Sequence, residues 1–202
     1  MIKTIIFDFG DVFINLDKAA TSREFNNCRV PELTTGLLDK NLQYEKGLIS
    51  SEEFVGAYCS EFEHLEKEQV LKSWNAILVD FPKYRYEFLK KLSEEKDYKL
   101  ILLSNTNEIH IDWVKENVPF FEDFQKCFDA FYLSHEINFR KPDTEIYKFV
   151  LEKHQLKPDE CLFIDDTKEN TNAAATLGIH TWNIEPTRED IIDLFIAKQD
   201  LF

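Results

Sequence analysis

The chain has 202 residues, of which 38 are acidic and 24 are lysine or arginine, so its formal net charge is −14. A field of this sign repels nucleic-acid backbones and anionic membrane surfaces, and neither is an expected partner. Hydrophobic residues make up 44% of the chain and charged residues 31%, which is typical of a folded protein. At this length we expect one globular domain with an insertion, or two small domains.

The cysteines and the N-terminus bear on the cellular compartment. The four cysteines form no Cys-x-x-Cys pair, which favours reduced thiols over a metal cluster or a disulfide scaffold. No signal-peptide pattern opens the chain, and no apolar run approaches the ~20 residues of a membrane span. We therefore expect a cytoplasmic protein. The sequence leaves its oligomeric state open.

Four short apolar runs predict strands that are buried on both faces of a parallel sheet. The first run is Thr4–Phe7. The helix-like segments that follow it, with no strand among them, are Asp17–Cys28, Glu32–Leu42, Ser51–Phe62 and Glu66–Leu78. Four consecutive helices exceed what one crossover between parallel strands needs, so we expect a helical insertion rather than a cover for one face of the sheet.

From residue 82 onward, strand and helix patterns alternate. The remaining strand candidates are Leu100–Leu103, Phe128–Leu133 and Cys161–Ile164. The helix candidates are Tyr84–Leu92, Ile109–Val118, Ile146–His154, Asn170–Leu177 and Asp190–Ala197. These patterns predict an α/β fold, with a doubly wound, Rossmann-like parallel sheet in residues 1–14 and 82–202 and a helical cap in residues 15–81.

Polar residues follow three of the four apolar runs, and ligands of open α/β sheets bind beyond the carboxyl ends of the strands. Asp8 follows the first run, the stretch 104–106 the second, and the pair 165–166 the fourth. Lys141, in a loop before a predicted helix, is a candidate for the same crevice. Each residue alone has a structural interpretation, as a helix cap or as a surface charge. Together, an acid, a hydroxyl, a cation and an acidic pair suit phosphoryl transfer with a hard metal ion.

The motifs that contain these residues resemble the haloacid dehalogenase-like hydrolase superfamily. Its four motifs are similar to FDFGDV, LLSNTN, RKPDTEIY and FIDDTKENTNAA, and the matches span most of the chain. The helical insertion stands where one subclass of the family carries a mobile cap. The short stretches NTNEIH, YLS, RKP and IYKFVLE resemble sequences of one branch of this superfamily, the sugar-phosphate phosphatases of the α-D-glucose-1-phosphate type.

This resemblance implies a Mg²⁺-dependent phosphatase that acts on a small phosphorylated metabolite, such as a sugar phosphate. It implies Asp8 as the nucleophile, which forms an aspartyl-phosphate that water then hydrolyses. The implied phosphate ligands are Ser104, Asn105 and Lys141, and Lys141 would also neutralise developing charge. The implied metal ligands are Asp8, the Gly10 carbonyl, Asp166 and, directly or through water, Asp165.

Residue 10 departs from the pattern of the family. Most phosphatases of this superfamily have an aspartate there that protonates the leaving group, whereas this chain has Gly10. Asp11 stands one residue further, where the turn tends to need positive φ, and aspartate tolerates that conformation. We therefore expect Asp11 to be a turn residue, and we expect a preference for good leaving groups such as anomeric sugar phosphates.

Two further residues are candidates for substrate specificity. Glu45 lies in a glycine-containing loop between two predicted helices of the insertion, and such loops meet the substrate in caps of this family. His110 follows Ser104 by six residues and either lines the pocket or only sits on its helix. Two alternatives to the phosphatase stay open: a binding or regulatory protein that retained the fold, and a metal-free haloacid dehalogenase, against which the acidic pair argues.

Overall fold

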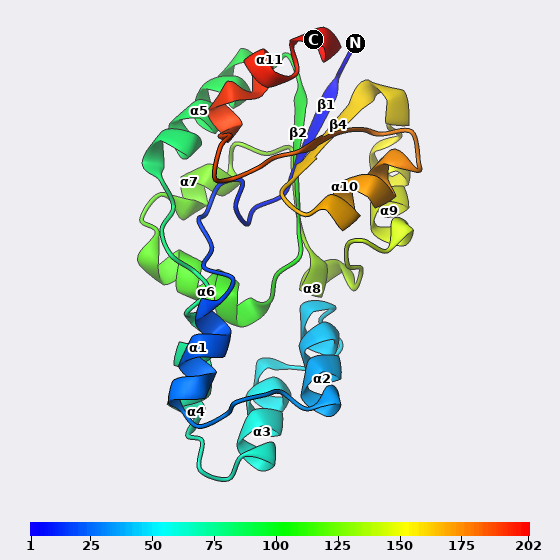
Figure 1. Ribbon diagram of the computed structural model, residues 1–202. Coiled ribbons are helices and arrows are strands. Elements are labelled where there is room, and N and C mark those ends of the chain that lie inside the picture. Colours follow the sequence, from blue (N-terminus) through cyan, green and yellow to red (C-terminus); the bar gives the residue numbers. More distant parts are fainter.

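The computed structural model describes residues 1–202, and at its centre lies a five-stranded parallel sheet (Figure 1). The strands are β1 (Thr4–Phe7), β2 (Lys99–Ser104), β3 (Ala130–Leu133), β4 (Cys161–Asp165) and β5 (His180–Asn183). Their order across the sheet is β3-β2-β1-β4-β5, so the chain winds in both directions from β1. The doubly wound α/β fold predicted from the apolar runs is confirmed.

Helices cover both faces of this sheet. The helices after the insertion are α5 (Lys83–Glu95), α6 (Glu108–Asn117), α7 (Phe121–Gln125), α8 (Ser134–Ile137), α9 (Thr144–His154), α10 (Lys168–Ala175) and α11 (Leu194–Ala197). In Figure 1, α5, α6, α7 and α11 lie on one side of the strands, and α9 and α10 lie on the other. None of the helices combines the length and the apolar character that crossing a membrane requires.

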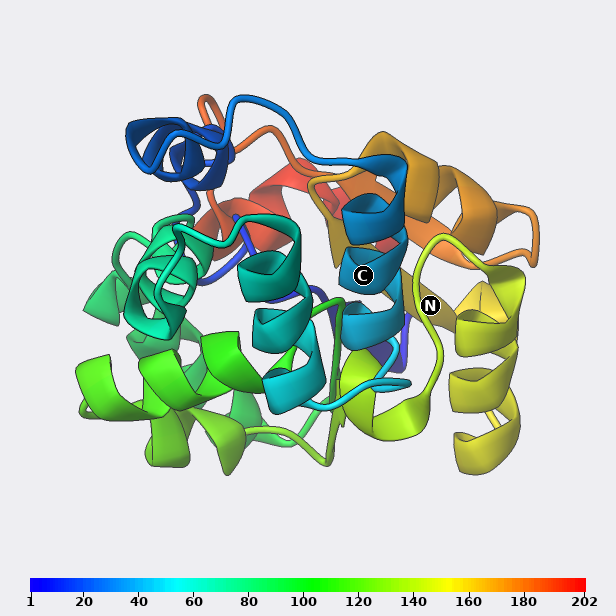
Figure 2. The ribbon, with the colours of Figure 1, turned by 90° about the horizontal axis from the view of Figure 1, so that it is seen from below.

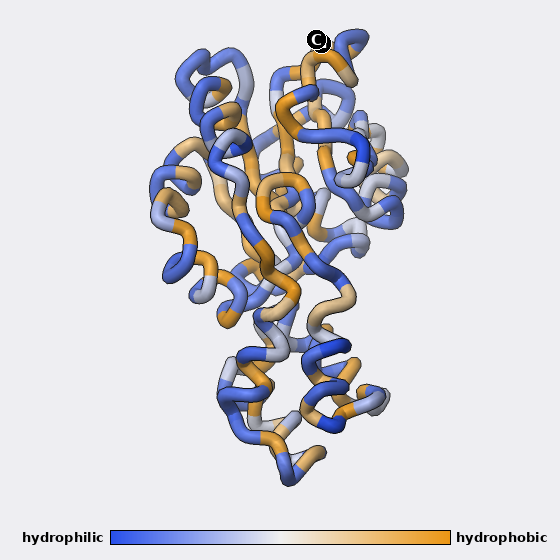
Figure 3. Tube along the Cα trace, turned by 60° about the vertical axis from the view of Figure 1, so that its left-hand side comes forward, coloured by the Kyte–Doolittle hydropathy of each residue, from blue (hydrophilic) through white to orange (hydrophobic).

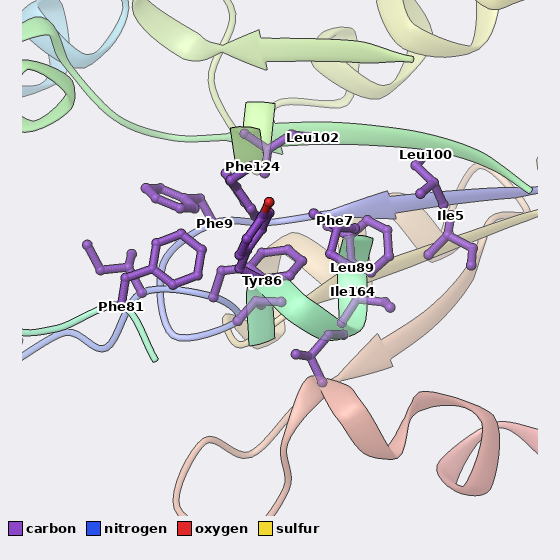
Figure 4. Packing of buried hydrophobic residues seen from close by; sticks show 14 of the residues in the cluster. Ile5, Phe7, Phe9, Phe81, Tyr86, Leu89, Leu100, Leu102, Phe124 and Ile164 are labelled. Atoms are coloured by element: carbon purple, nitrogen blue, oxygen red, sulfur yellow. The ribbon is translucent and has the colours of Figure 1, made fainter. Parts of the chain in front are cut away.

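Each face of the sheet has its own apolar core. The larger cluster contains 25 buried residues, and aromatic rings fill much of it. In Figure 4, Phe9, Phe81 and Phe124 pack beside the first strand, with ring centroids 4.9–5.7 Å apart. The opposite face buries a smaller cluster of 11 residues. Because burial of one aromatic side chain contributes about 2–3 kcal/mol, this packing fixes β1 and therefore the position of the residue that follows it.

The segment between β1 and α5 contains four helices and no strand: α1 (Ala20–Asn27), α2 (Thr35–Glu45), α3 (Ser51–Glu61) and α4 (Lys67–Asn75). They pack around a third apolar cluster, which takes only Ile109 from outside the segment. These helices lie beyond the carboxyl ends of the strands, and Figure 2 views the molecule from their side. In Figure 3, hydrophobic residues are concentrated inside the part that contains the sheet and inside the four-helix segment.

The two chain segments that lead into and out of these helices pair with each other. The amide of Asn15 donates to the carbonyl of Asp80, and the amide of Val79 donates to the carbonyl of Asn15, at 2.8 and 3.1 Å. Asn15 and Phe81 are also the positions near which the sequence predicts the ends of the insertion. We propose that residues 15–81 form a cap and that these paired segments are its hinge.

The structure departs from the sequence prediction in four places. The edge strand β5 was not predicted, because its sequence His-Thr-Trp-Asn is not an apolar run and half of it faces solvent. The short helices α7 and α8 were also missed, since five and four residues are too few to show a helical period. The helix expected over 190–197 is a 3₁₀ turn, Ile191–Asp193, followed by α11.

Candidate active site

The carboxyl ends of β1, β2 and β4 bring the predicted polar residues to one edge of the sheet. Phe7 aligns with Leu102 and with Ile164, so Asp8 lies between the ends of the two neighbouring strands. Ser104 is the last residue of β2, and Asp165 is the last residue of β4. The sequence prediction that these side chains converge is therefore met by the register of the sheet.

Lys141 joins two of these carboxylates. Its Nζ lies 2.7 Å from Oδ1 of Asp8 and 2.6 Å from Oδ2 of Asp165, and its side chain is only 1% exposed. The two carboxylates raise the pKa of Lys141 against the opposing effect of burial. Lys141 is therefore a buried, charged side chain with two anionic partners, and not the surface charge that its sequence alone allowed.

The position of Lys141 is fixed through its backbone by Asn105. The amide of Lys141 donates to Oδ1 of Asn105, and Nδ2 of Asn105 donates to the carbonyl of Lys141, both at 2.9 Å. The side chain of Asn105 is thus used within the protein, which leaves its backbone for a ligand. Ser104, 2% exposed, has only a weak contact with the carbonyl of Asn105 at 3.4 Å, so its hydroxyl is available to a bound group.

Asp8 is a buried carboxyl group, and burial raises its pKa to about 7. Lys141 opposes this shift, whereas the neighbouring charges of Asp165 and Asp166 add to it. Three carboxylates in one site repel each other. Lys141 and Lys18 do not balance them, because Lys18 is shared between Asp166 and Asp11. A site of this kind favours a further cation.

Oxygen atoms suited to a hard metal ion meet at this point. One carboxylate oxygen each of Asp8, Asp165 and Asp166 lies within 4.8 Å of the others. Asn170 donates to both oxygens of Asp165, at 3.0 and 3.1 Å, and the amide of Thr167 donates to Oδ1 at 2.8 Å. Such supporting hydrogen bonds orient a carboxylate ligand. The residues present fit a Mg²⁺ site, because three hard oxygen donors converge there.

Asp166 is the more accessible of the two adjacent acids. Its Oδ2 accepts a hydrogen bond from Nζ of Lys18, and the same Nζ lies 3.1 Å from Oδ2 of Asp11. Burial raises the pKa of Asp166, and Lys18 opposes the shift. Lys18 therefore supplies a positive charge at the outer side of the acidic group.

Asp11 has the conformation of a turn residue. Its φ is 54°, and its Oδ1 accepts a hydrogen bond from the amide of Leu16 at 2.9 Å. The side chain thus holds the loop after β1 in shape. The prediction of a turn residue is confirmed, because both carboxylate oxygens have partners within the protein.

A cavity of about 120 Å³ lies beside this edge of the sheet, lined mainly by the loop after β1, the residues after β2 and α6, with Glu45 at the end of α2 and the segment after α4 completing it. Half of its 14 lining residues are hydrophobic, and the polar ones include Ser104, Asn105, Glu45 and His110. Gly10 lines it as well, beside Leu16. The cavity is thus lined by both specificity candidates and by two of the three phosphate-binding candidates, Ser104 and Asn105, whereas Lys141 does not line it.

The two specificity candidates differ in what their polar atoms do. His110 contacts the carbonyl of Trp74 through Nε2 and the side chain of Asn107 through Nδ1, both at 3.1 Å. Burial lowers its pKa to about 4, so the imidazole is neutral at pH 7. Because both of its nitrogens have partners within the protein, neither is free for a substrate. Glu45 pairs through Oε2 with Nε of Arg140, and it keeps acceptor capacity toward the cavity.

Sequence reasoning missed the roles of Lys18, Arg140 and Asn170 in this site. Arg140 and Asn170 stand within two of the matched motifs, RKPDTEIY and FIDDTKENTNAA, which was the only signal available for them. Lys18 stands in the segment that enters the helical insertion, where nothing in its neighbours indicates a contact with residue 166.

Comparisons with known proteins agree with this geometry. Residues 2–178 match the family model described as haloacid dehalogenase-like hydrolase. D-ribitol-5-phosphate phosphatase of Bacteroides thetaiotaomicron is 30% identical over 200 residues, which cover 92% of this chain and 93% of that protein.

Solved structures give the same picture. A HAD family enzyme of Bacteroides thetaiotaomicron, solved with magnesium and inorganic phosphate, is 37% identical and has a TM-score of 0.83, with 96% of this chain and 100% of that chain covered. A predicted HAD-like hydrolase of Porphyromonas gingivalis is 29% identical with the same TM-score, covering 98% and 97%. A dehalogenase structure at 17% identity and a TM-score of 0.59 shares the fold. The chain belongs to the haloacid dehalogenase-like hydrolase family, as its four motifs predict.

Proposed function

We propose that this protein is a Mg²⁺-dependent phosphatase that hydrolyses a small phosphorylated metabolite through an aspartyl-phosphate on Asp8. The observation that carries the proposal is the buried contact of Lys141 with both Asp8 and Asp165, at the strand ends where Asp166 and Ser104 also lie. The relative named as a phosphatase, and the similar enzyme solved with magnesium and phosphate, support the same reaction.

Asp8, Asp165 and Asp166 would hold the metal ion, together with the carbonyl of Gly10. When bound, Mg²⁺ neutralises phosphate charge that the carboxylates would otherwise repel. At 4 Å, two unit charges of one sign repel each other by about 4 kcal/mol at an effective dielectric constant of 20. A cation beside Asp8 is therefore needed before a phosphate can approach.

The nucleophile is a carboxylate oxygen of Asp8, which attacks phosphorus while the P–O bond to the leaving group breaks. Lys141 holds Asp8 by one oxygen and stabilises negative charge on the phosphoryl group as it transfers. The hydroxyl of Ser104 and the backbone of Asn105 donate to the non-bridging oxygens. Water then attacks the aspartyl-phosphate and releases inorganic phosphate and free Asp8.

The leaving-group oxygen has no acid at residue 10. Gly10 has no side chain, and both oxygens of Asp11 are engaged in the turn. The leaving group therefore takes its proton from water. We propose that rates depend strongly on leaving-group pKa, so that aryl and anomeric phosphates react faster than simple alkyl phosphates.

We propose a sugar phosphate or a polyol phosphate as the substrate class. A cavity of about 120 Å³ suits a short organic group, and Glu45 can accept hydrogen bonds from hydroxyl groups there. D-ribitol 5-phosphate, in the name of the similar phosphatase, carries such hydroxyl groups, and with its primary-alcohol leaving group it would be among the slower substrates. His110 would contribute only its ring surface, because both of its nitrogens are bonded within the protein.

The test is phosphate release from a panel of sugar, polyol, alkyl and aryl phosphates, with and without Mg²⁺. Asp8→Asn is the control for the nucleophile. Asp159→Asn, at an exposed acid that precedes the N-terminal end of β4 and so lies at the opposite edge of the sheet, is the matched control for a lost charge. Release that requires both Mg²⁺ and Asp8 supports the proposal. Absence of release from every compound would instead favour a binding protein with this fold.

A dehalogenase is the less favoured activity. Attack on a carbon that bears a carboxylate gains nothing from two further acids near the nucleophile. In this site, carboxylate oxygens of Asp165 and Asp166 lie within 4.8 Å of one of Asp8. The similar dehalogenase structure shares the fold alone at 17% identity. Halide release from 2-chloropropionate without metal would overturn this preference.

A further inference from the structure

The loop between α2 and α3 packs directly on the segment that carries Lys141. We call Glu45–Ser50 the cap loop and Ser134–Asp143 the lysine segment. The hydroxyl of Ser134 donates to the carbonyl of Glu45 at 2.6 Å. Gly47 lies so close to the lysine segment, with φ of 65°, that a Cβ there would stand 1.9 Å from the carbonyl oxygen of His135. The two segments therefore meet at backbone distance.

Two ion pairs join the cap loop to the lysine segment. Glu45 Oε2 pairs with Arg140 Nε at 2.5 Å, and both side chains are about three-quarters buried. Lys46 Nζ pairs with Asp143 Oδ2 at 2.8 Å, with side chains 34% and 53% exposed. The pairs start from adjacent residues of one loop, yet only Arg140 also contacts Lys141. Its Nη1 donates to the carbonyl of Lys141 at 2.9 Å.

The carbonyl of Lys141 therefore accepts two hydrogen bonds, one from Arg140 and one from Asn105. Asn105 comes from the end of β2, in the sheet, whereas Arg140 is held by the cap loop through Glu45. A lysine backbone fixed from two sides gives the long Lys141 side chain one path to the two carboxylates that it contacts. Loss of either hydrogen bond to its carbonyl makes the Lys141 backbone, from which the side chain extends, more mobile.

We propose that Arg140 is a positioning residue for Lys141. Held by Glu45, the guanidinium fixes the Lys141 backbone, so that the Lys141 ammonium is placed against Asp8 and the phosphoryl group when the cap loop is docked. This role rests on the proposed phosphatase function. It makes the cap loop part of the catalytic geometry in addition to its part in binding the organic group, because a cation stabilises a transition state only from a fixed position.

The experiment compares Arg140→Met, Arg140→Lys and Glu45→Gln with Lys46→Met, which breaks the second ion pair of the same interface. The substrate is p-nitrophenyl phosphate with Mg²⁺, because its leaving group needs no proton. Arg140→Met is expected to lower kcat by about 10–100-fold with KM within about twofold, as a misplacement near 1 Å does. Arg140→Lys keeps the positive charge but loses the planar guanidinium with its several donors. Its kcat should therefore lie between those of Arg140→Met and the wild type. Lys46→Met should stay near the wild-type value.

A second measurement does not depend on turnover. Hydrogen exchange of peptides that span residues 138–144 should be faster in Arg140→Met than in Lys46→Met, because only the former loses a bond to the Lys141 carbonyl. Equal exchange in both variants, or equal kcat, overturns the positioning role. A wild-type protein that releases no phosphate, with faster exchange in Arg140→Met, overturns the proposed function and retains Arg140 as the residue that fixes Lys141.

Discussion

The side chain of Leu16 fills the space beside Gly10. A Cβ built on Gly10 would lie 2.7 Å from Cδ1 of Leu16, whereas its distance to Oδ2 of Asp8 would be 3.9 Å. The place from which an acid would reach the leaving group is thus taken by an apolar side chain. Residue 10 thus lacks the acid of the usual pattern, and the side chain of Leu16 lies where such an acid would start.

This relationship predicts that an acid at residue 10 works better together with a smaller residue 16. Gly10→Asp alone should gain less than the double variant, because the aspartate must first shift the side chain of Leu16. Gly10→Asp with Leu16→Ala should raise kcat on an alkyl phosphate by up to about 10²-fold, the lower end of what general acid catalysis supplies. The rate on p-nitrophenyl phosphate should change much less. Leu16→Ala alone is the control, and an equal gain on both substrates would contradict this explanation.

Replacement of Lys141 should affect stability as well as activity. Lys141→Met leaves two buried carboxylates without their cation, and loss of one partner of a buried pair costs about 3–5 kcal/mol of the free energy of unfolding. We expect this loss in urea unfolding without metal and a smaller loss with Mg²⁺, since the ion compensates charge. Phosphate release should fall by at least about 10²-fold. Lys148→Met, at an exposed lysine of α9, should leave both quantities unchanged.

Binding of Mg²⁺ should stabilise the fold through Asp166. A ligand at 100 times its Kd raises the free energy of unfolding by about 2.7 kcal/mol, which thermal melts with and without Mg²⁺ detect as a higher Tm. Asp166→Asn should lose most of this shift. Lys18→Met should bind Mg²⁺ more tightly in calorimetry, because the lysine that contacts Asp166 no longer competes. If Mg²⁺ raises the Tm of Asp166→Asn as much as that of the wild type, the ion binds at another site.

The buried His110 predicts a dependence of stability on pH. Its pKa is lowered from 6.5 to about 4 in the folded protein, so the unfolded chain binds the proton first as pH falls. The contribution of His110 to stability is therefore full above about pH 6.5 and declines toward pH 4, by about 2 kcal/mol between pH 7 and pH 5. Urea unfolding at both values should show a smaller difference in His110→Gln. The control is His180→Gln, at an exposed residue of the edge strand. If the free energy of unfolding changes equally between pH 7 and pH 5 in both variants, His110 is not the cause of the pH dependence.

Much of the fold was predictable because its strands have a strong local signal. Strands buried on both faces must be apolar at every position, and Ile5, Ile101 and Phe163 lie in such runs. The polar residues that follow three of the four runs also predicted the edge of the sheet where Asp8 and Asp165 meet. The family followed from the motifs that contain these residues.

The sequence by itself therefore determined four of the five strands, the helical insertion and the residue types of the site, because each depends on short-range periodicity or on a contiguous motif. Only the tertiary structure decided which side chains touch. Lys141 contacts Asp8 across 133 positions, and Arg140 contacts Glu45 across 95. Such contacts arise from the register of the sheet and the docking of the cap loop. A hydrogen bond between distant residues leaves no period in the chain, so packing alone reveals it.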